Sequence, residues 1–257
     1  MIQVVCIKQV ADTETRVRVG PDGHSLDPAG VTWILNPYDE FALEEALRIR
    51  ERTPAAAPGP GAGEVIAISL GGATVPTTLR NALAMGADRA IHLKTEVVTP
   101  DSLQVARALA AEIRGLSADL VWFGKQAVDD DQAQVGPMVA ELLEIPCATV
   151  VAKLELEDGR AVAEREIEGG REVVELTLPA ALTADKGLNE PRYASLKGIM
   201  AAKKKTIEEK PAVLGEPRLE VIALELPPAR KAGRVVGQGV AAVPELVRLL
   251  REEARAL

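Results

Sequence analysis

Short apolar runs alternate with amphipathic stretches over the first 150 residues of the chain. The runs of strand length cover residues 2–7, 64–70, 89–93 and 119–123. Helical spacing of apolar residues predicts helices over 36–50, 74–85, 102–113 and 132–143. Because strands and helices take turns, we expect parallel strands joined by right-handed crossovers, which is a doubly wound α/β domain.

The pattern changes after residue 146. Three runs rich in Val, Ile and Leu follow one another over 148–156, 160–167 and 172–178, with only Asp158-Gly159 and Gly169-Gly170 between them. Such dipeptides favour tight hairpin turns. We therefore expect an antiparallel hairpin added to a mostly parallel sheet.

The rest of the chain has weaker signals. The segment 53–63, which after Thr53 contains only Pro, Ala and Gly, predicts a flexible surface connection, and a loop is expected beyond Pro179. Residues 208–239 contain several prolines, and an amphipathic helix is predicted over 244–255. So long a segment without its own core is typical of an arm that wraps a partner. We expect an α/β domain over 1–207 and an arm over 208–257.

Composition narrows the function. Aromatic residues make up only 2% of the chain and the formal net charge is −8, so neither stacking platforms nor positive charge favours nucleic-acid binding. The two cysteines, Cys6 and Cys147, form no motif, and the N-terminus resembles no signal peptide. A cytoplasmic protein without a transmembrane helix is expected.

Sequence motifs of self-contained enzymes are missing. The chain has no GxSxG, GxxxxGK[ST] or HExxH motif, and no GxGxxG after the first strand. Its two histidines, His24 and His92, have no metal-ligand partner at a useful spacing. A hydrolase or a metalloenzyme is therefore not indicated, and no catalytic or metal-binding residue is assigned.

The segment GKQAVDDDQAQV, residues 124–135, follows a buried strand and precedes a helix. This places it at the carboxyl edge of the sheet, where open α/β folds hold ligands. Gly124 would let the backbone approach a ligand, Lys125 could meet a phosphate, and amides at the helix start could hold anionic oxygens. The alternative is that residues 129–131 only cap the helix.

Residues 36–39, Asn-Pro-Tyr-Asp, are open to the same two interpretations. A helix cap explains them alone. However, together with Cys6 and Leu70, which end the first and second predicted strands, they would surround the same crevice as residues 124–135.

A third segment, residues 184–205, is basic on an otherwise acidic chain and also carries Leu196, Ile199 and Met200. A solvated charged face is one interpretation. An apolar anchor beside basic groups on an exposed loop is the other, and it is typical of a small docking site.

At these residues the chain resembles the β subunits of electron-transfer flavoproteins over essentially its whole length. The similarity lies in the first strand ending at Lys8 and in the segments NPYDEFALEEALRI, LRNALAMGADRAIHL, GKQAVDDD, EREIEGG followed by LPA, and LNEPRYASLKGIMAAKKK. Their order and spacing make the resemblance specific.

The resemblance implies a Rossmann-like, adenine-nucleotide-binding fold and an electron carrier rather than an enzyme. Its partner would be an α subunit that holds most of the FAD, while this subunit holds AMP. Electrons would come from acyl-CoA and related flavoprotein dehydrogenases, in fatty acid β-oxidation, and go to a quinone reductase. Carried over by the resemblance, the AMP site consists of Cys6, Asn36, Pro37, Tyr38, Asp39, Leu70, Gly124, Lys125, Gln126, Ala127, Val128, Asp129, Asp130, Asp131, Gln132, Ala133, Gln134 and Val135.

The resemblance also implies two contact regions. Glu166 matches a glutamate that meets an arginine of the α subunit beside the flavin. Dehydrogenases would dock on a recognition loop, here called the docking segment, with Leu196 as its anchor. This segment consists of Arg192, Tyr193, Ala194, Ser195, Leu196, Lys197, Gly198, Ile199, Met200 and Ala201.

Two alternatives remain at this point. Some members of the family bind a second FAD in place of AMP and bifurcate electrons from NADH. A free-standing adenine-nucleotide-binding module of similar fold is the other alternative, and the long C-terminal arm argues against it.

Overall fold

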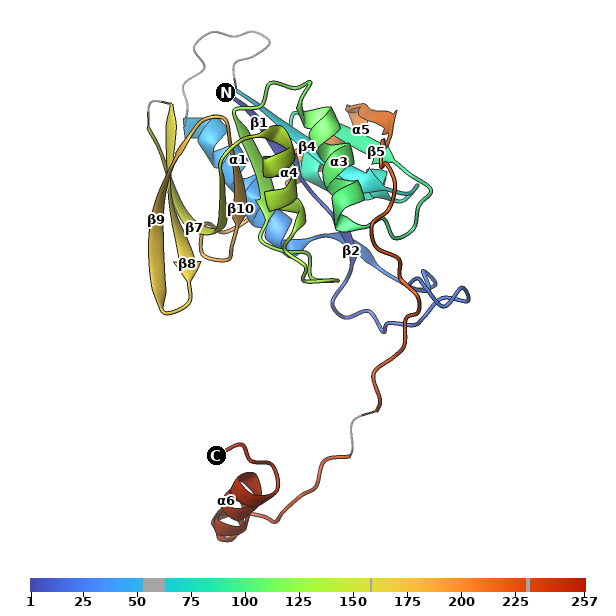
Figure 1. Ribbon diagram of the computed structural model, residues 1–257, viewed down its shortest axis with the longest axis vertical. Helices are drawn as coiled ribbons and strands as arrows, with labels where there is room; N and C mark the ends of the chain where they lie inside the picture. The colour runs from blue at the N-terminus through green and yellow to red at the C-terminus, as the bar shows by residue number, and fades with distance from the viewer. Residues whose placement is uncertain (53–62, 158, 230–231) are drawn as a thin grey trace. The chain divides into compact units, whose positions relative to one another are not determined.

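The computed structural model describes residues 1–52, 63–157, 159–229 and 232–257 (Figure 1). The connection expected over 53–63 lies almost entirely outside the described residues. The chain divides into two compact units, Met1–Leu224 and Glu225–Leu257, which are described separately.

The first unit is built on a nine-stranded sheet with the strand order β11-β5-β4-β1-β6-β10-β7-β8-β9. Its pairings are parallel from β11 to β7, while β7, β8 and β9 pair antiparallel. The strands are β1 (Ile2–Cys6), β4 (Glu64–Gly71), β5 (Arg89–Lys94), β6 (Leu120–Gly124), β7 (Cys147–Glu157), β8 (Arg160–Ile167), β9 (Gly170–Thr177), β10 (Ala180–Ala184) and β11 (Ile207–Pro211). The predicted α/β class with an antiparallel addition is confirmed.

Helices cover both faces of this sheet (Figure 1). They are α1 (Pro37–Arg52), α2 (Val75–Met85), α3 (Ser102–Ile113), α4 (Val135–Leu143) and α5 (Leu196–Lys204). Alternate residues of each strand point to opposite faces, so Val5 and Ala67 join the core under α1 and α2, whereas Val4 and Ile68 join the core under α3 and α4. These two aliphatic layers fix the sheet between the helices.

A small hairpin lies apart from the main sheet. Its strands are β2 (Gln9–Ala11) and β3 (Trp33–Leu35), which pair antiparallel. Asn36 follows β3 directly and its amide donates to the Lys8 carbonyl, at 3.0 Å. The hairpin therefore brings the start of α1 back to the end of β1.

The prediction of a loop directly after Pro179 is wrong, because strand β10 begins at Ala180. Ala180–Ala184 forms a central strand between β6 and β7, and all five of its residues are buried. Three of the five are alanine, which has little strand propensity of its own. Pairing on both sides and complete burial determine this strand, and a local pattern does not reveal them.

The docking segment is also more regular than the expected loop. Leu196–Lys204 forms α5, because the Ser195 hydroxyl accepts a hydrogen bond from the Gly198 amide, at 3.0 Å, and caps the helix. Beyond it, β11 pairs with β5 at the sheet edge. Residues 208–224 thus lie in the first compact unit, whereas the arm was expected to begin at 208.

The second unit contains the 3-10 turn η1 (Val240–Ala242) and the helix α6 (Val243–Glu252). Leu249 is buried within this unit, while Val240, Val243 and Leu246 are exposed. The predicted C-terminal amphipathic helix is confirmed. Over the described ranges, no helix has both the length and the apolar character needed to cross a bilayer.

Candidate functional site

Asp39, in the first turn of α1, connects three segments at the carboxyl edge of the sheet. Its carboxylate accepts hydrogen bonds from the Lys8 amide at 2.7 Å, the Gly124 amide at 2.9 Å and the Asn36 side chain at 2.9 Å. The ends of β1 and β6 and the start of α1 therefore converge, as the crevice hypothesis required.

The buried environment changes the acidity of Asp39. Burial, which disfavours the charged form, raises the pKa of the Asp39 carboxyl to about 7, although the hydrogen bonds from Lys8, Asn36 and Gly124 oppose that shift. The thiol of Cys6 is buried as well, and this burial is the main reason that its pKa lies well above the usual range; the negative charge of Asp39 raises it further. Cys6 is therefore a packed thiol rather than a reactive thiolate.

Asn36 holds the 124–135 segment against α1. Its amide nitrogen donates to the Gln126 carbonyl at 2.9 Å, and its oxygen accepts from the Val128 amide at 3.1 Å. Asn36 is almost completely buried. The side chain of Asn36 thus orders the loop. Its backbone carbonyl accepts hydrogen bonds from the amides of Asp39 and Glu40 and so begins α1.

The capping interpretation of the three aspartates is wrong. The helix α4 begins only at Val135, whereas Asp129 and Asp130 both accept hydrogen bonds from the Lys8 ammonium, each at 2.8 Å. Partial burial works against the charge of Lys8, but the two carboxylates outweigh it and raise the pKa of that group. Asp131 instead accepts from the Gln126 side chain.

Lys8 is the residue of this site that sequence reasoning missed. It joins the end of the first strand to a loop more than 120 residues away, and its partners, Asp129 and Asp130, precede the first residue of α4, Val135, by six and five positions. An exposed lysine after a strand has no distinctive pattern. The acidic run opposite it was the only available signal.

The start of α4 has free capacity for an anion. The side chain of Gln134, which precedes the helix, makes no capping hydrogen bond within the described part of the chain. Asp131 and Ala133 have left-handed backbone conformations, each with a φ of 52°. Irregular backbone of this kind ahead of an uncapped helix presents amide groups to a phosphate or carboxylate.

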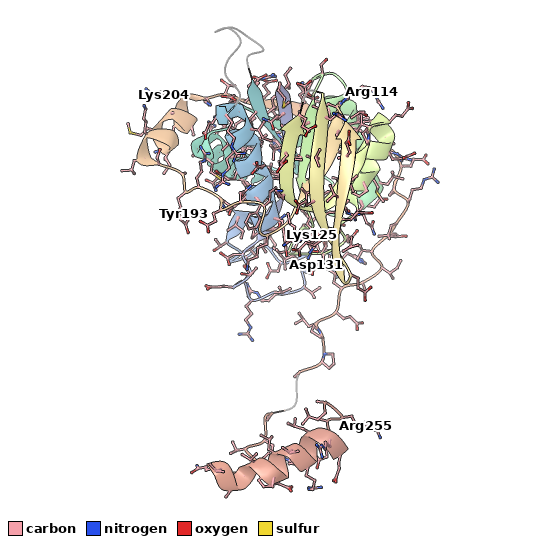
Figure 2. All side chains as sticks on the ribbon, turned by 90° about the vertical axis from the view of Figure 1, so that its left-hand side faces the viewer. Arg114, Lys125, Asp131, Tyr193, Lys204 and Arg255 are labelled. Atoms are coloured by element: carbon pink, nitrogen blue, oxygen red, sulfur yellow. The ribbon has the colours of Figure 1, made fainter. Side chains whose placement is uncertain are left out.

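Lys125 is paired within the domain rather than free. Its ammonium pairs with Asp185 at 3.2 Å and lies 5.9 Å from the centre of the Tyr38 ring. Lys125 and Asp131 lie toward the same end of the sheet (Figure 2). The cation is therefore positioned by β10 and α1 together.

Gly124 is required by the protein itself. A Cβ at this position would lie 2.3 Å from an oxygen of Asp39 and 2.7 Å from Tyr38. The expectation was that Gly124 lets a ligand approach the backbone. The closest neighbour is instead the start of α1, so any larger residue would separate β6 from that helix.

The other residues expected in the crevice contact neighbouring elements by packing or by hydrogen bonds. Leu70 lies near the end of β4, beside β1, and it packs with the core under α3 and α4, as does Cys6. Gln132 accepts a hydrogen bond from the Ser102 hydroxyl at 2.7 Å and so connects the loop to α3.

The second cysteine, Cys147, is also unreactive, because burial raises the pKa of its thiol to about 11. Cys6 and Cys147 are both free.

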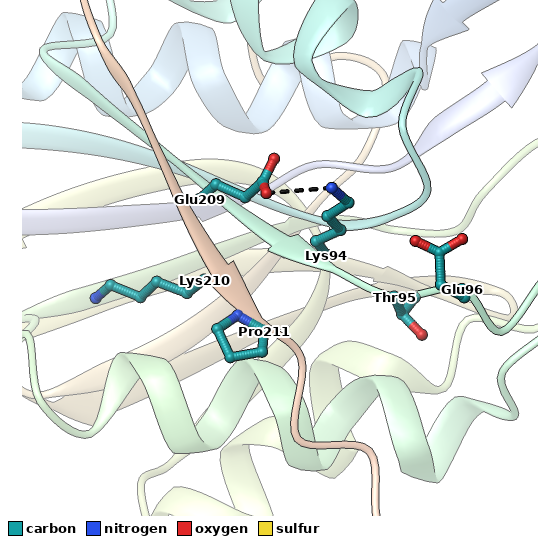
Figure 3. A pocket seen from close by; sticks show the side chains of 6 residues that line it. All are labelled: Lys94, Thr95, Glu96, Glu209, Lys210 and Pro211. Atoms are coloured by element: carbon teal, nitrogen blue, oxygen red, sulfur yellow. Dashed lines mark hydrogen bonds and ion pairs between the residues drawn. The ribbon is translucent and has the colours of Figure 1, made fainter.

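Two other hollows lie at the carboxyl ends of β5 and β11. One, of about 290 Å³, has two lysines and two glutamates on its wall, and Lys94 pairs with Glu209 across it (Figure 3). A larger open hollow of about 1070 Å³ is lined partly by His24 and residues 212–221. The balanced charges of the smaller hollow favour no particular ion. Among the described residues, no group of three His, Cys, Asp or Glu could hold a metal.

The docking segment presents apolar side chains to solvent. Tyr193 is 99% exposed, Leu196 82% and Met200 66%. Lys197, Lys203 and Lys204 are also exposed around them. Tyr193 and Lys204 lie on the same side of the domain (Figure 2). Exposed apolar and basic side chains thus occur together on this segment, as the docking hypothesis required.

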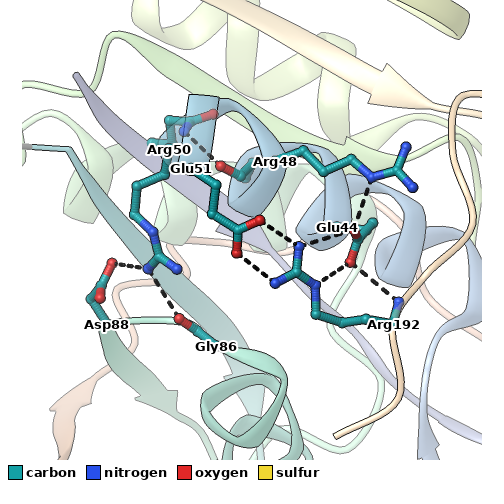
Figure 4. A network of polar contacts seen from close by, with 9 residues as sticks. Glu44, Arg48, Arg50, Glu51, Gly86, Asp88 and Arg192 are labelled. Atoms are coloured by element: carbon teal, nitrogen blue, oxygen red, sulfur yellow. Dashed lines mark hydrogen bonds and ion pairs between the residues drawn. The ribbon is translucent and has the colours of Figure 1, made fainter. Parts of the chain in front are cut away.

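Arg192 differs from the lysines of this segment because it is anchored to α1. The hydrogen bonds from Arg192 to Glu51 contribute most to raising the pKa of the guanidinium, and those to Glu44 contribute next. Burial alone would raise the pKa of Glu44, but the bonds from Arg192 and Arg48 lower it. This network is drawn in Figure 4.

Glu166 lies at the exposed end of the β8–β9 hairpin. It is opposite Arg171 in the register, and their side chains pair at 3.5 Å. Its carboxylate is half exposed, so it is accessible to another chain.

Comparisons with known proteins show which family the chain belongs to. Residues 24–214 match the family model of the electron transfer flavoprotein domain. The chain is 39% identical to the electron transfer flavoprotein subunit beta of Bacillus subtilis (strain 168), with 98% of each chain covered. It is 44% identical to the subunit of the same name from Bradyrhizobium diazoefficiens, with 99% of each covered, and 44% identical to that of Homo sapiens, with 90% of each covered. With this similarity along nearly its whole length, the chain belongs to the β-subunit family of electron transfer flavoproteins.

Proposed function

We propose that this chain holds AMP in the crevice and forms a heterodimeric electron carrier with an α subunit that holds most of the FAD. The observation that carries the nucleotide assignment is the uncapped start of α4, preceded by left-handed backbone at Asp131 and Ala133. A helix start without a side-chain cap suits a phosphate, because the amides of Val135 and Gly136 can donate to its oxygens.

Each residue of the crevice would have a defined task in holding the nucleotide. Asn36 and Asp39 fix the loop, and the amides near Gln134 donate to the phosphate oxygens. Asp129 and Asp130 would repel a phosphate, but Lys8 offsets one of their two negative charges. Lys125, held by Asp185, adds positive charge at the side of the crevice.

The electron-transfer role rests on the exposed docking segment. FAD, when bound, supplies the redox chemistry, and this chain supplies orientation and recognition. Acyl-CoA and related dehydrogenases would place an apolar pocket over Leu196, with acidic groups facing Lys197 and Lys203. Glu166 would face the α subunit near the flavin, and the reduced carrier would deliver its electrons to a quinone reductase.

The C-terminal arm, expected over 208–257, would pack on the α subunit. The exposed Val243 and Leu246 of α6 support this for the part in the second unit. The chain expressed alone should therefore aggregate and bind little FAD, whereas co-expression with its α subunit should give a stable yellow complex in the cytoplasm. A monodisperse yellow monomer would contradict the proposal.

The nucleotide assignment is tested by purifying the chain with its natural α subunit, denaturing the complex and separating the released nucleotides. One AMP and one FAD per heterodimer is the expected result. Two FAD without AMP would instead identify the electron-bifurcating type, and no nucleotide beyond one FAD would contradict a crevice ligand.

A further inference from the structure

Arg192 makes an unusually complete set of contacts for a residue beside a docking surface (Figure 4). Its Nε donates to Glu44 at 2.7 Å and its Nη1 to Glu51 at 2.6 Å. Its Nη2 donates to both carboxylates, at 3.1 and 3.0 Å, and its backbone amide donates to Glu44 at 3.2 Å. A planar guanidinium fork makes this pattern possible, and a lysine ammonium does not reproduce it.

The charge of Arg192 is consequently already balanced inside the domain. The Glu44 side chain is only 4% exposed and that of Arg192 32%, while Glu51 lies at the surface. Two carboxylates face one guanidinium, and Arg48 also pairs with Glu44. Little positive field remains to steer an acidic partner, unlike at the exposed Lys203 and Lys204.

The far end of the docking helix is attached to a different element. Arg80 of α2 donates to the carbonyls of Ala202 and Lys205, and the Lys205 ammonium donates to the Ala87 carbonyl at 2.6 Å. In the middle, Gly198 packs so closely that a Cβ would lie 2.3 Å from the Ala84 carbonyl oxygen. These contacts hold the body and the end of α5 against α2.

The approach to α5 depends on α1. Asn189 donates to the Phe41 carbonyl at 2.9 Å and to Glu45 at 3.1 Å, and Arg192 makes the last side-chain anchor before the Ser195 cap. Between Arg192 and Ser195, Tyr193 is fully exposed and only the small side chain of Ala194 packs against the core. Arg192 is therefore the main polar anchor of Leu196 on the α1 side, and α2 holds the other side.

We propose that Arg192 is a positioning residue, which holds Leu196 in its docking geometry through Glu44 and Glu51 and does not itself contact the dehydrogenase. This inference rests on the proposed docking function of the segment. A segment fixed before binding loses less conformational freedom on association, so the clamp should lower the apparent KM without affecting electron transfer within the complex.

The test compares Arg192→Lys with wild type in the complete heterodimer, using steady-state transfer from a partner acyl-CoA dehydrogenase. Lysine keeps the charge but loses the fork, so we expect the apparent KM to rise about tenfold with an unchanged kcat. Amide hydrogen exchange at residues 193–199 should also become faster before any partner is added. A steering cation would instead tolerate lysine, and a wild-type KM for Arg192→Lys would overturn the inference.

Glu51→Gln provides a second variant that leaves no buried charge, since Glu51 is half exposed. We expect a smaller rise in KM, about threefold, and no further rise when Glu51→Gln is added to Arg192→Lys, because both weaken one clamp. If Arg192 contacted the partner directly, Glu51→Gln would free its charge and lower KM, and that result would also overturn the inference.

Two controls separate this inference from the docking function itself. Arg114→Lys changes a comparable exposed arginine, which donates to the Leu142 carbonyl from the C-terminal end of α3, and it should leave KM unchanged (Figure 2). Leu196→Ala tests the docking function. An unchanged KM for Leu196→Ala would refute the docking function. If the KM rises for Leu196→Ala but stays at the wild-type value for Arg192→Lys, only the positioning role is refuted.

Discussion

The crevice and the docking segment both depend on a buried carboxylate of α1, and the two carboxylates have opposite effects on the surrounding chain. Asp39 accepts N–H groups from β1, β6 and its own turn, and so draws three segments inward. Glu44, five residues further along, binds Arg192 of a distant segment whose neighbouring side chains face solvent. One helix thus closes the proposed ligand site at its first turn and supports the proposed docking segment along its side.

The difference shows what each region can tolerate. Around Asp39, the polar side chains and amides are satisfied by one another, so a change at that residue affects the whole carboxyl edge. In the docking segment, the exposed residues are proposed to contact the partner, whereas the buried contact between Arg192 and Glu44 holds the segment in place. Substitutions in the two regions should therefore separate stability from partner affinity.

The largest effect is expected from a matched pair of glycine substitutions. A Cβ at either Gly124 or Gly198 would lie 2.3 Å from an oxygen atom. Gly124→Ala should reduce the free energy of unfolding by about 3 kcal/mol or more, because it forces apart β6 and Asp39 and breaks buried hydrogen bonds. Gly198→Ala should cost less, about 2 kcal/mol, because it must displace the surface helix α5 from the Ala84 carbonyl but breaks no buried hydrogen bond of the Asp39 cluster. Urea denaturation of the heterodimer measures both, and equal losses would contradict the distinction.

A pH-dependent effect follows from Asp39. Its pKa is raised to about 7 in the folded protein, whereas an unfolded aspartate titrates near 3.9. Between these values the folded state binds the extra proton, so the contribution of Asp39 to stability falls as the pH rises from about 4 to about 7 and is constant above that. The loss is on the order of a few kcal/mol.

Comparing wild type with Asp39→Asn by urea denaturation between pH 4.5 and 8 checks this dependence. The variant should be less stable overall, since its amide group brings a donor toward the donors of the site, but the difference from wild type should shrink as the pH rises. A difference that stays constant or grows with pH would show that Asp39 is not protonated on folding.

A more local effect is expected at the docking segment. Leu196 is 82% exposed, so Leu196→Ala removes no core packing and should leave the melting temperature unchanged. As an anchor in a partner pocket it is worth ~2 kcal/mol, or about a thirtyfold rise in the apparent KM of a dehydrogenase. Lost thermal stability with unaltered kinetics would contradict the anchor role.

The smallest effect should come from the exposed charges. Lys203→Ala is expected to slow association a few fold at low ionic strength and to have little effect at physiological salt, because rim charges act mainly through long-range steering. Stopped-flow association at two salt concentrations measures this. An effect that is independent of salt would indicate a direct contact instead.

How much of this could be predicted from the sequence differs between the two regions. The alternation of strands and helices placed residues 36–39 and 124–135 at one edge of the sheet, and the structure brings them together through Asp39 and Asn36. The pairing of Lys8 with Asp129 could not be predicted, because it depends on side chains more than 100 residues apart.

In the docking segment, the exposed apolar residues were evident but their support was not. A basic run that includes Arg192 is typical of solvated charge, and only the fold shows that Glu44 and Glu51 of α1 lie opposite it. Similarly, the strand character of Ala180–Ala184 comes from β6 and β7 on either side. Contacts between distant segments decide these features, and local patterns do not contain them.

The most direct test of a nucleotide phosphate at the start of α4 is the AMP content of Gln134→Glu in the purified heterodimer. A carboxylate at a helix N-terminus favours the helix but repels a phosphate, so folding should be kept while AMP is lost. Gln134→Ser, a neutral capping residue, serves as the control. We predict AMP well below one per FAD for Gln134→Glu, with an unchanged melting temperature for the nucleotide-free protein and full AMP in the control. Stoichiometric AMP in Gln134→Glu would contradict the placement of the phosphate.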